Sequence, residues 1–127
     1  MDIIYKCEIP LIPRSKKNSM QIVKFGDKTA LIQSKLYRDY ADDCKFFIKQ
    51  LKTPINIPVN LKCVFYVKDK RKRDLVNLLN AIQDILVKYN ILKDDNYNII
   101  TSVNGSKIIY DKQISKTIIE ISNYENL

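Results

Sequence analysis

The sequence contains no histidine and no tryptophan, and it has only two glycines and four prolines among its 127 residues. Without histidine, the chain cannot carry an imidazole general base, a histidine-containing catalytic triad or a histidine-containing zinc site. Its low glycine and proline content excludes collagen-like and low-complexity chains. No stretch approaches the ~18 apolar residues of a membrane span, and the first residues lack the features of a signal peptide. We therefore expect a folded cytoplasmic protein that does not enter a membrane.

Cysteine is also scarce. Cys7, Cys44 and Cys63 are odd in number and widely spaced, and no pair has the CxxC spacing of a zinc ribbon. Free cysteines of this kind are usually small core residues, and reduced thiols are typical of the cytoplasm. The length, with 46% hydrophobic and 28% charged residues, predicts one globular domain over residues 1–127.

Positive charge is in excess, because 22 lysines and arginines face 14 aspartates and glutamates, which gives a net charge of +8. Much of the excess lies in two short segments, whose basic residues are Arg14, Lys16 and Lys17 in the first and Lys68, Lys70, Arg71, Lys72 and Arg73 in the second. Such clustering is typical of a surface that binds nucleic-acid phosphates. The alternative is a lysine-rich coding bias that produces only a solvated surface.

Hydrophobic periodicity predicts an α+β fold with two helices packed on a mixed sheet. Apolar alternation and turn residues predict strands at 3–9, 20–25, 28–32, 60–67, 97–103, 107–110 and 116–121. The pair Gly26-Asp27 predicts a tight hairpin between the second and third strands. Helical spacing predicts one helix from Ser34 to about residue 51 and another from Asp74 to about residue 89. The element order is then β-ββ-α-β-α-ββ-β.

The second predicted helix carries the candidate chemistry. Polar residues lie opposite its apolar stripe or at its ends, namely Asp74, Asn77, Asn80, Asp84, Asp94 and Asp95. Carboxylate and amide oxygens suit Mg²⁺ better than zinc, and magnesium beside basic residues suits phosphodiester hydrolysis. Taken alone, however, Asp74 would be a helix cap and the adjacent aspartates an ordinary polar turn.

The helix also separates these carboxylates. Asp74 and Asp84 are ten residues apart, or ~15 Å of helix rise, so they cannot bind the same ion. Asp95 follows the far end of the helix, roughly 20 Å from Asp74 if the turn stays local. Either the chain doubles back, or an antiparallel pair of these helices in a C2 dimer brings Asp95 of one chain toward Asp74 of the other. Val76 and Val87 are candidates for that helix contact.

Together these residues resemble the RusA-like family of Holliday-junction resolvases of phages and prophages. The family pattern is a basic stretch, then Asp-Leu-x-Asn-Leu-x-x-Ala-x-x-Asp, then a hydrophobic pair and Asp-Asp. This chain matches it over residues 71–84 and 91–95, and the basic stretch at 14–19 and Ser-Lys-x-Tyr at 34–37 also fit. The resemblance implies a homodimeric endonuclease that uses Mg²⁺, or alternatively Mn²⁺, to cut four-way DNA junctions symmetrically during recombination or repair.

By this resemblance, Asp74 and Asp95 correspond to catalytic metal-binding carboxylates, and Asn77 and Asp84 to recurring motif positions. Asp84 or Asp94 would compensate for a missing ligand, because Val76 stands where the family typically has a second aspartate. Asn80 stands where the family typically has a lysine. These departures give an alternative function, a non-catalytic protein that binds junctions or other DNA and retains the fold.

Overall fold

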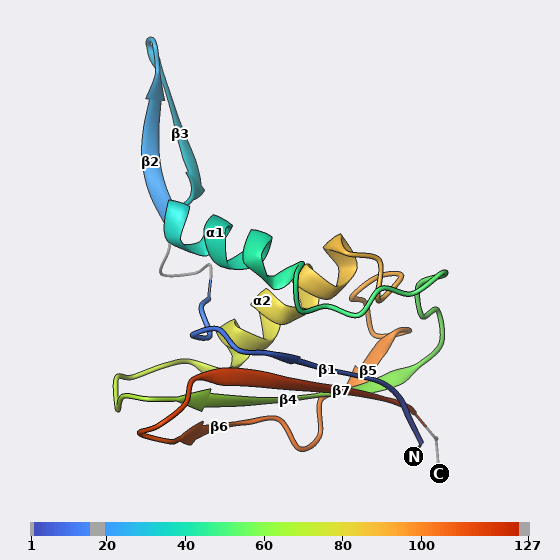
Figure 1. Ribbon diagram of the computed structural model, residues 1–127. Coiled ribbons are helices and arrows are strands. Elements are labelled where there is room, and N and C mark those ends of the chain that lie inside the picture. Colours follow the sequence, from blue (N-terminus) through green and yellow to red (C-terminus); the bar gives the residue numbers. More distant parts are fainter. Residues whose placement is uncertain (1, 16–19, 125–127) are drawn as a thin grey trace.

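The computed structural model describes residues 2–15 and 20–124, and it has the predicted α+β fold and element order. Figure 1 shows both helices on one side of a mixed sheet, with a two-stranded hairpin projecting beyond them. The helices are α1 (Lys35–Cys44) and α2 (Leu75–Lys88). The strands are β1 (Ile3–Ile9), β2 (Met20–Phe25), β3 (Lys28–Gln33), β4 (Val59–Val67), β5 (Ile100–Ser102), β6 (Lys107–Tyr110) and β7 (Lys116–Asn123).

The five-stranded sheet is organised around β4, which pairs along both of its edges. β7 runs antiparallel to β4 and to β1, whereas β5 and β6 pair in parallel with the other edge of β4. Seven of the nine residues of β4 are buried, as expected for a central strand. Because β4 ends at Val67, the basic segment 68–73 leaves the end of the sheet and leads directly into α2.

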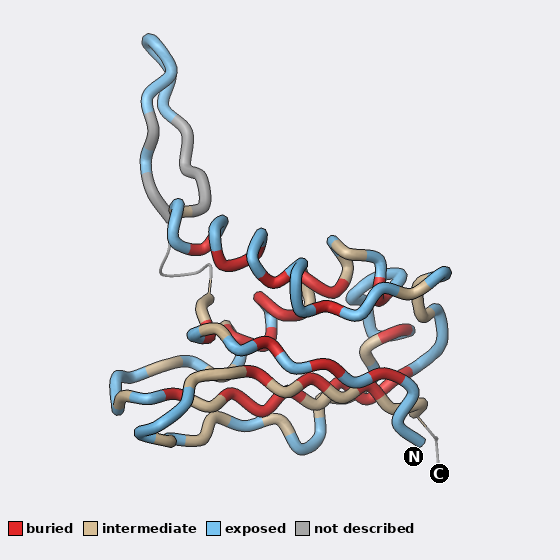
Figure 2. The backbone as a smooth tube through the Cα atoms, in the orientation of Figure 1, coloured by how far each residue is buried: buried red, intermediate tan, exposed pale blue. Residues whose placement is uncertain are grey.

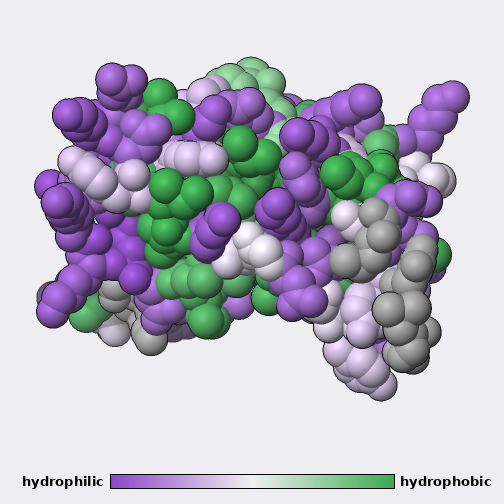
Figure 3. Space-filling view, turned by 90° about the horizontal axis from the view of Figure 1, so that it is seen from below, coloured by the Kyte–Doolittle hydropathy of each residue, from purple (hydrophilic) through white to green (hydrophobic). Residues whose placement is uncertain are grey.

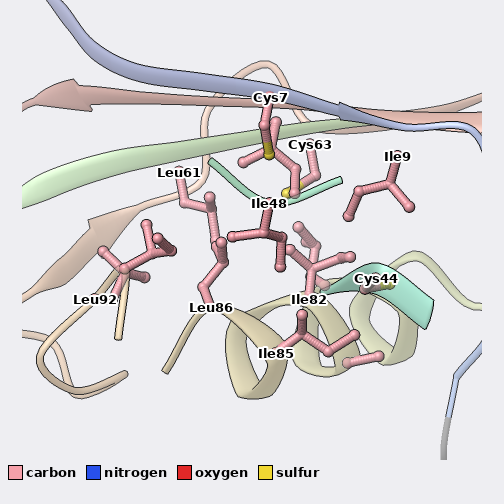
Figure 4. Packing of buried hydrophobic residues seen from close by; sticks show 14 of the residues in the cluster. Cys7, Ile9, Cys44, Ile48, Leu61, Cys63, Ile82, Ile85, Leu86 and Leu92 are labelled. Atoms are coloured by element: carbon pink, nitrogen blue, oxygen red, sulfur yellow. The ribbon is translucent and has the colours of Figure 1, made fainter. Parts of the chain in front are cut away.

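An apolar stripe on α2 packs against the sheet, which confirms the predicted core face of this helix. Its buried residues are Leu78, Leu79, Ala81, Ile82, Ile85 and Leu86. Figure 4 shows Ile82, Ile85 and Leu86 facing Leu61 of β4 and Ile9 of β1 across the core. Figure 2 shows the same division, since the buried parts of both helices and of the sheet face one another.

The three cysteines are buried core residues, as predicted. Burial raises the pKa of the Cys44 thiol to about 12 and also raises the pKa of the Cys63 thiol. Both thiols are therefore neutral at physiological pH, and a neutral buried thiol is neither a good nucleophile nor a good metal ligand.

We expect Ile82→Ala to lower the free energy of unfolding by about 2–5 kcal/mol, because the side chain is fully buried and its removal leaves a cavity. Urea denaturation followed by circular dichroism measures the change. The matched control is Leu36→Ala on α1, whose side chain is 53% exposed and whose truncation should cost at most about 0.5 kcal/mol. Equal losses of unfolding free energy in the two variants would contradict the burial of Ile82 in the core.

Helix α1 ends at Cys44, so the prediction of a helix reaching about residue 51 is wrong. The backbone N–H groups of residues 45–47 each donate to a carbonyl three residues earlier, and such tight turns end an α-helix. Ser34 is the N-cap, as predicted, and accepts a hydrogen bond from the Tyr37 N–H. Leu36 and Phe47 were predicted on the apolar face of this helix but are 53% and 38% exposed.

Two strand predictions also need correction. The strand predicted over 97–103 is only β5, because the N–H groups of Ile99 and Ile100 both donate to the Asn96 carbonyl and form a turn there. The predicted inward face of β1 is wrong at Ile3, which is 54% exposed. The register of β1 against β7 shifts between Ile3 and Tyr5, and this irregularity breaks the alternation of the strand.

The hairpin of β2 and β3 turns at Gly26-Asp27, as predicted. Phe25 pairs with Lys28, and Gly26 has a φ of 63°, the left-handed conformation that glycine accommodates best. Ile22 and Phe25 are 76% and 61% exposed, in keeping with the projection of the hairpin away from the core in Figures 1 and 2. Across the two described segments of the chain, neither helix is long and apolar enough to span a membrane.

The sheet face opposite the helices has a mixed surface. Figure 3 shows apolar side chains on this face surrounded by hydrophilic ones. A shallow hollow of about 170 Å³ lies over β4 and β7, lined by Lys62, Val64, Tyr66, Ile118 and Glu120. Glu120 lies 3.5 Å from Lys6 and 3.9 Å from Lys62, and partly exposed ion pairs of this kind stabilise the fold only weakly.

Candidate functional site

A groove of about 540 Å³ lies where the chain leaves β1, begins α1 and enters α2. Four cations and two carboxylates line it, namely Arg14, Arg71, Lys72, Arg73, Asp69 and Asp74, together with Ser15, Asn77 and the apolar residues Ile12, Pro13, Leu36 and Leu78. We call this the basic groove. The amino terminus of α2 adds a positive potential to it. The groove thus brings Arg14 of the first basic segment beside the second basic segment, more than fifty residues later in the sequence.

Asp69 lines this groove and pairs with residues that follow it in the basic segment. The two terminal nitrogens of Arg73 donate to the two carboxylate oxygens of Asp69 at 2.8 and 3.1 Å, and the Arg71 N–H donates at 2.9 Å. The Arg73 hydrogen bond and then the Arg71 N–H lower the pKa of the Asp69 carboxyl to about 2. Arg73, predicted as a DNA contact, is therefore already paired with a carboxylate.

Asp69 is absent from the predicted site. The signal that could have found it is its position four residues before Arg73 within a basic run, because this spacing suits an ion pair. The net charge of the run only subtracts the aspartate from the basic residues, and it does not show that Asp69 pairs with Arg73.

Asp74 is the N-cap of α2, which confirms the capping interpretation of this residue. Its Oδ1 accepts hydrogen bonds from the Val76 N–H at 2.9 Å and the Asn77 N–H at 3.4 Å. Both bonds use Oδ1, so the cap does not require Oδ2. Asp74 and Asn77 both line the basic groove, whereas the exposed Asn80 does not.

Asp84 lies apart from the basic groove, in a hollow of about 130 Å³ between α1 and α2 lined by Tyr37, Ala41, Asp84, Ile85 and Lys88. Burial raises the pKa of the Tyr37 hydroxyl to about 12, with a smaller contribution from the Asp84 carboxylate. Asn77 and Asp84 are nearly aligned along α2, but only Asn77 reaches the groove because Asp84 faces α1. The structure therefore does not bring Asp84 to Asp74.

Asp94 and Asp95 lie in an exposed turn beyond the other end of α2. The Leu92 N–H donates to the Leu86 carbonyl at 3.2 Å, which ties the chain to the last turns of the helix. Asp94 accepts hydrogen bonds from the Asp95 N–H at 2.7 Å and from the Asn96 side chain at 3.2 Å. The chain therefore does not double back, and α2 separates Asp95 from Asp74.

The other basic residues that the sequence predicts to contact DNA differ in their surroundings. Lys68 and Lys70 are exposed, and the Lys70 ammonium lies 5.1 Å from the centre of the Tyr110 ring, within cation–π range. Arg14 is half-buried at the groove, whereas Lys16 and Lys17 lie outside the described residues. Within the residues that the structure describes, no three acidic or cysteine side chains are grouped to hold a metal ion.

A comparison with protein families finds a match over most of the chain. The family model described as endodeoxyribonuclease RusA matches residues 10–122. A search of curated proteins finds no match. The matched range includes both basic segments, all of α2 and the turn that carries Asp94 and Asp95.

Proposed function

Because the chain belongs to the RusA endodeoxyribonuclease family, a family of Holliday-junction endonucleases, we propose that it is a magnesium-dependent enzyme that resolves four-way DNA junctions by paired phosphodiester hydrolysis. One observation carries this proposal: the basic groove places the Asp74 carboxylate among four cations at the start of α2. A groove of this composition suits a phosphodiester that must be both held and hydrolysed.

The cations of the groove bind the DNA backbone. Arg14 approaches from the end of β1, and Arg71 and Lys72 approach from the segment before α2. Contacts of this kind recognise the position and shape of phosphates and carry no base sequence. They suit an enzyme that selects a branched structure, and they make its affinity fall as the salt concentration rises.

The donor set at the groove fits a hard cation. Asp74 and Asn77 supply carboxylate and amide oxygens, and Mg²⁺ needs only one or two carboxylates when waters and substrate phosphates complete its shell. We assign Asp74 and Asp95 as the residues that would hold the ion. When bound there, Mg²⁺ would supply an activated water and offset charge on the phosphate, and Mn²⁺ would serve the same role.

In this proposal the metal site is shared between the two chains of a C2 homodimer, and the partner chain supplies Asp95 to the groove. Within one chain α2 separates Asp95 from Asp74, and the turn after the helix stays local. An antiparallel pair of α2 helices would place each Asp95 near the partner's Asp74. Val76 is 61% exposed on α2 and suits the contact, while Val87 is partly buried against the core and contributes less.

A second candidate function is DNA binding without cleavage. Val76 replaces the second aspartate of the motif, and the described residues hold no cluster of three metal-binding side chains in one chain. The cations of the groove would be retained under this alternative, so junction affinity alone does not separate the two functions.

We expect a synthetic four-way junction to be nicked symmetrically on two opposing strands when Mg²⁺ is present, and to remain intact in EDTA. A linear duplex of the same sequence is the matched control and should remain uncut. Junction affinity should fall at least about tenfold between ~50 and ~200 mM salt, because several phosphates are neutralised. Tight binding without nicks, even with Mn²⁺, would favour the non-catalytic alternative. A junction affinity that does not change with the salt concentration would contradict both candidate functions.

A further inference from the structure

We propose that Asp69 is a positioning residue of the basic groove. By holding Arg73, it fixes residues 69–74 in the conformation that presents Arg71, Lys72 and Asp74 to a DNA phosphate. This inference rests on the proposed function, and it assigns a role to an acidic residue within a basic surface.

The geometry of the pair supports this role. Asp69 and Arg73 meet through two hydrogen bonds of 2.8 and 3.1 Å, which fix the plane of the guanidinium as well as its distance. A third hydrogen bond of 2.9 Å, from the Arg71 N–H, joins the middle of the segment to the same carboxylate. Asp69 therefore holds the segment at two points.

The segment lacks regular secondary structure, and beside the Asp69 contacts the Lys70 ammonium lies 5.1 Å from the centre of the Tyr110 ring. Residues 68–73 form neither helix nor strand, and they connect Val67 at the end of β4 to Asp74, the cap of α2. Val67 is held by the Asp111 N–H, which donates to its carbonyl at 2.8 Å. Between these two anchors, the ion pair organises the backbone, and the Arg73 side chain is only 16% exposed within it.

Two explanations of Asp69 predict different effects of its removal on the binding and cleavage of a junction. If Asp69 is only a surface charge, its removal raises the net charge by one and should strengthen junction binding. If Asp69 positions the groove, its removal should slow cleavage although the surface becomes more positive. Tighter binding with unchanged cleavage therefore indicates a surface charge, whereas slower cleavage without tighter binding indicates a positioning role.

The test uses single-turnover cleavage of a four-way junction at saturating protein. Asp69→Asn retains an oxygen for the Arg71 N–H but loses the charge and the two-point contact with Arg73. Arg73→Lys retains the positive charge and loses the planar fork. We expect each variant to slow cleavage by about 10–100-fold without tighter junction binding, because misplaced groups lose their orientation. The double variant should lose little more than either single one.

Asp43→Asn is the matched control, because Asp43 lines a neighbouring hollow with Arg14 and its removal adds the same charge without changing the segment. Its cleavage rate should stay within about twofold of wild type. Amide hydrogen exchange over residues 69–74 should rise in Asp69→Asn and in Arg73→Lys but not in the control.

The outcomes separate this inference from the proposed function. Wild-type nicking with equally fast nicking by Asp69→Asn would overturn the positioning role and leave the proposed function intact. If the wild type does not nick the junction, the proposed function fails, and hydrogen exchange still tests Asp69. Unchanged exchange in both variants would then overturn the inference, whereas faster exchange would retain Asp69 as the residue that orders the segment.

Discussion

Asp74→Asn is expected to fold like the wild type and to cleave a four-way junction at least about a hundredfold more slowly. Asparagine is as good an N-cap as aspartate, and its side-chain oxygen can still accept the hydrogen bond from the Val76 N–H. It lacks the negative charge that the proposed magnesium site requires. Nicking rates with Mg²⁺ and thermal unfolding of the same preparation measure the two effects separately.

Asp74→Ala provides the comparison, because it removes both the charge and the cap. It should lose cleavage to the same extent and also lower the free energy of unfolding by about 1 kcal/mol relative to Asp74→Asn. Junction binding in EDTA should persist in both variants, since the cations of the groove remain. Cleavage by Asp74→Asn within a few-fold of wild type would show that Asp74 is only the helix cap and that the metal lies elsewhere.

The sequence was sufficient for most of the fold because its strongest signals are local. The apolar stripe of α2 and the cap at Asp74 follow from spacing within a few residues, and both are confirmed. The end of α1 was not predictable in this way. Ile48 is buried although α1 has already ended at Cys44. The helical spacing of apolar residues therefore continues past the last residue of the helix.

The site was only partly predictable, because periodicity identifies a face of a helix but not what covers that face. Asn77 and Asp84 share a flank of α2, yet Asn77 lines the basic groove and Asp84 packs beside Tyr37 of α1. The pairing of Asp69 with Arg73 was missed for a related reason. Its effect depends on the geometry of a segment without regular structure, which charge counting does not reveal.

Mixing two inactive variants tests the shared site. Asp74→Asn and Asp95→Asn should each be nearly inactive as homodimers, because every site lacks one carboxylate. In a heterodimer of the two, one site carries both substitutions and the other carries none if the site is shared between chains. We therefore expect the heterodimer to recover about half of the wild-type nicking rate, since one of the two sites of a C2 dimer is complete.

The heterodimer should nick the junction on one strand at a time, because paired cuts need two complete sites. Two different tags on co-expressed chains allow its purification. The matched control pairs Asp74→Asn with a chain that carries both Asp74→Asn and Asp95→Asn, which leaves no complete site in any arrangement. A purified heterodimer as inactive as this control would mean that Asp95 does not complete the partner's site. An active Asp95→Asn homodimer, in contrast, would mean that the metal at Asp74 is held without Asp95.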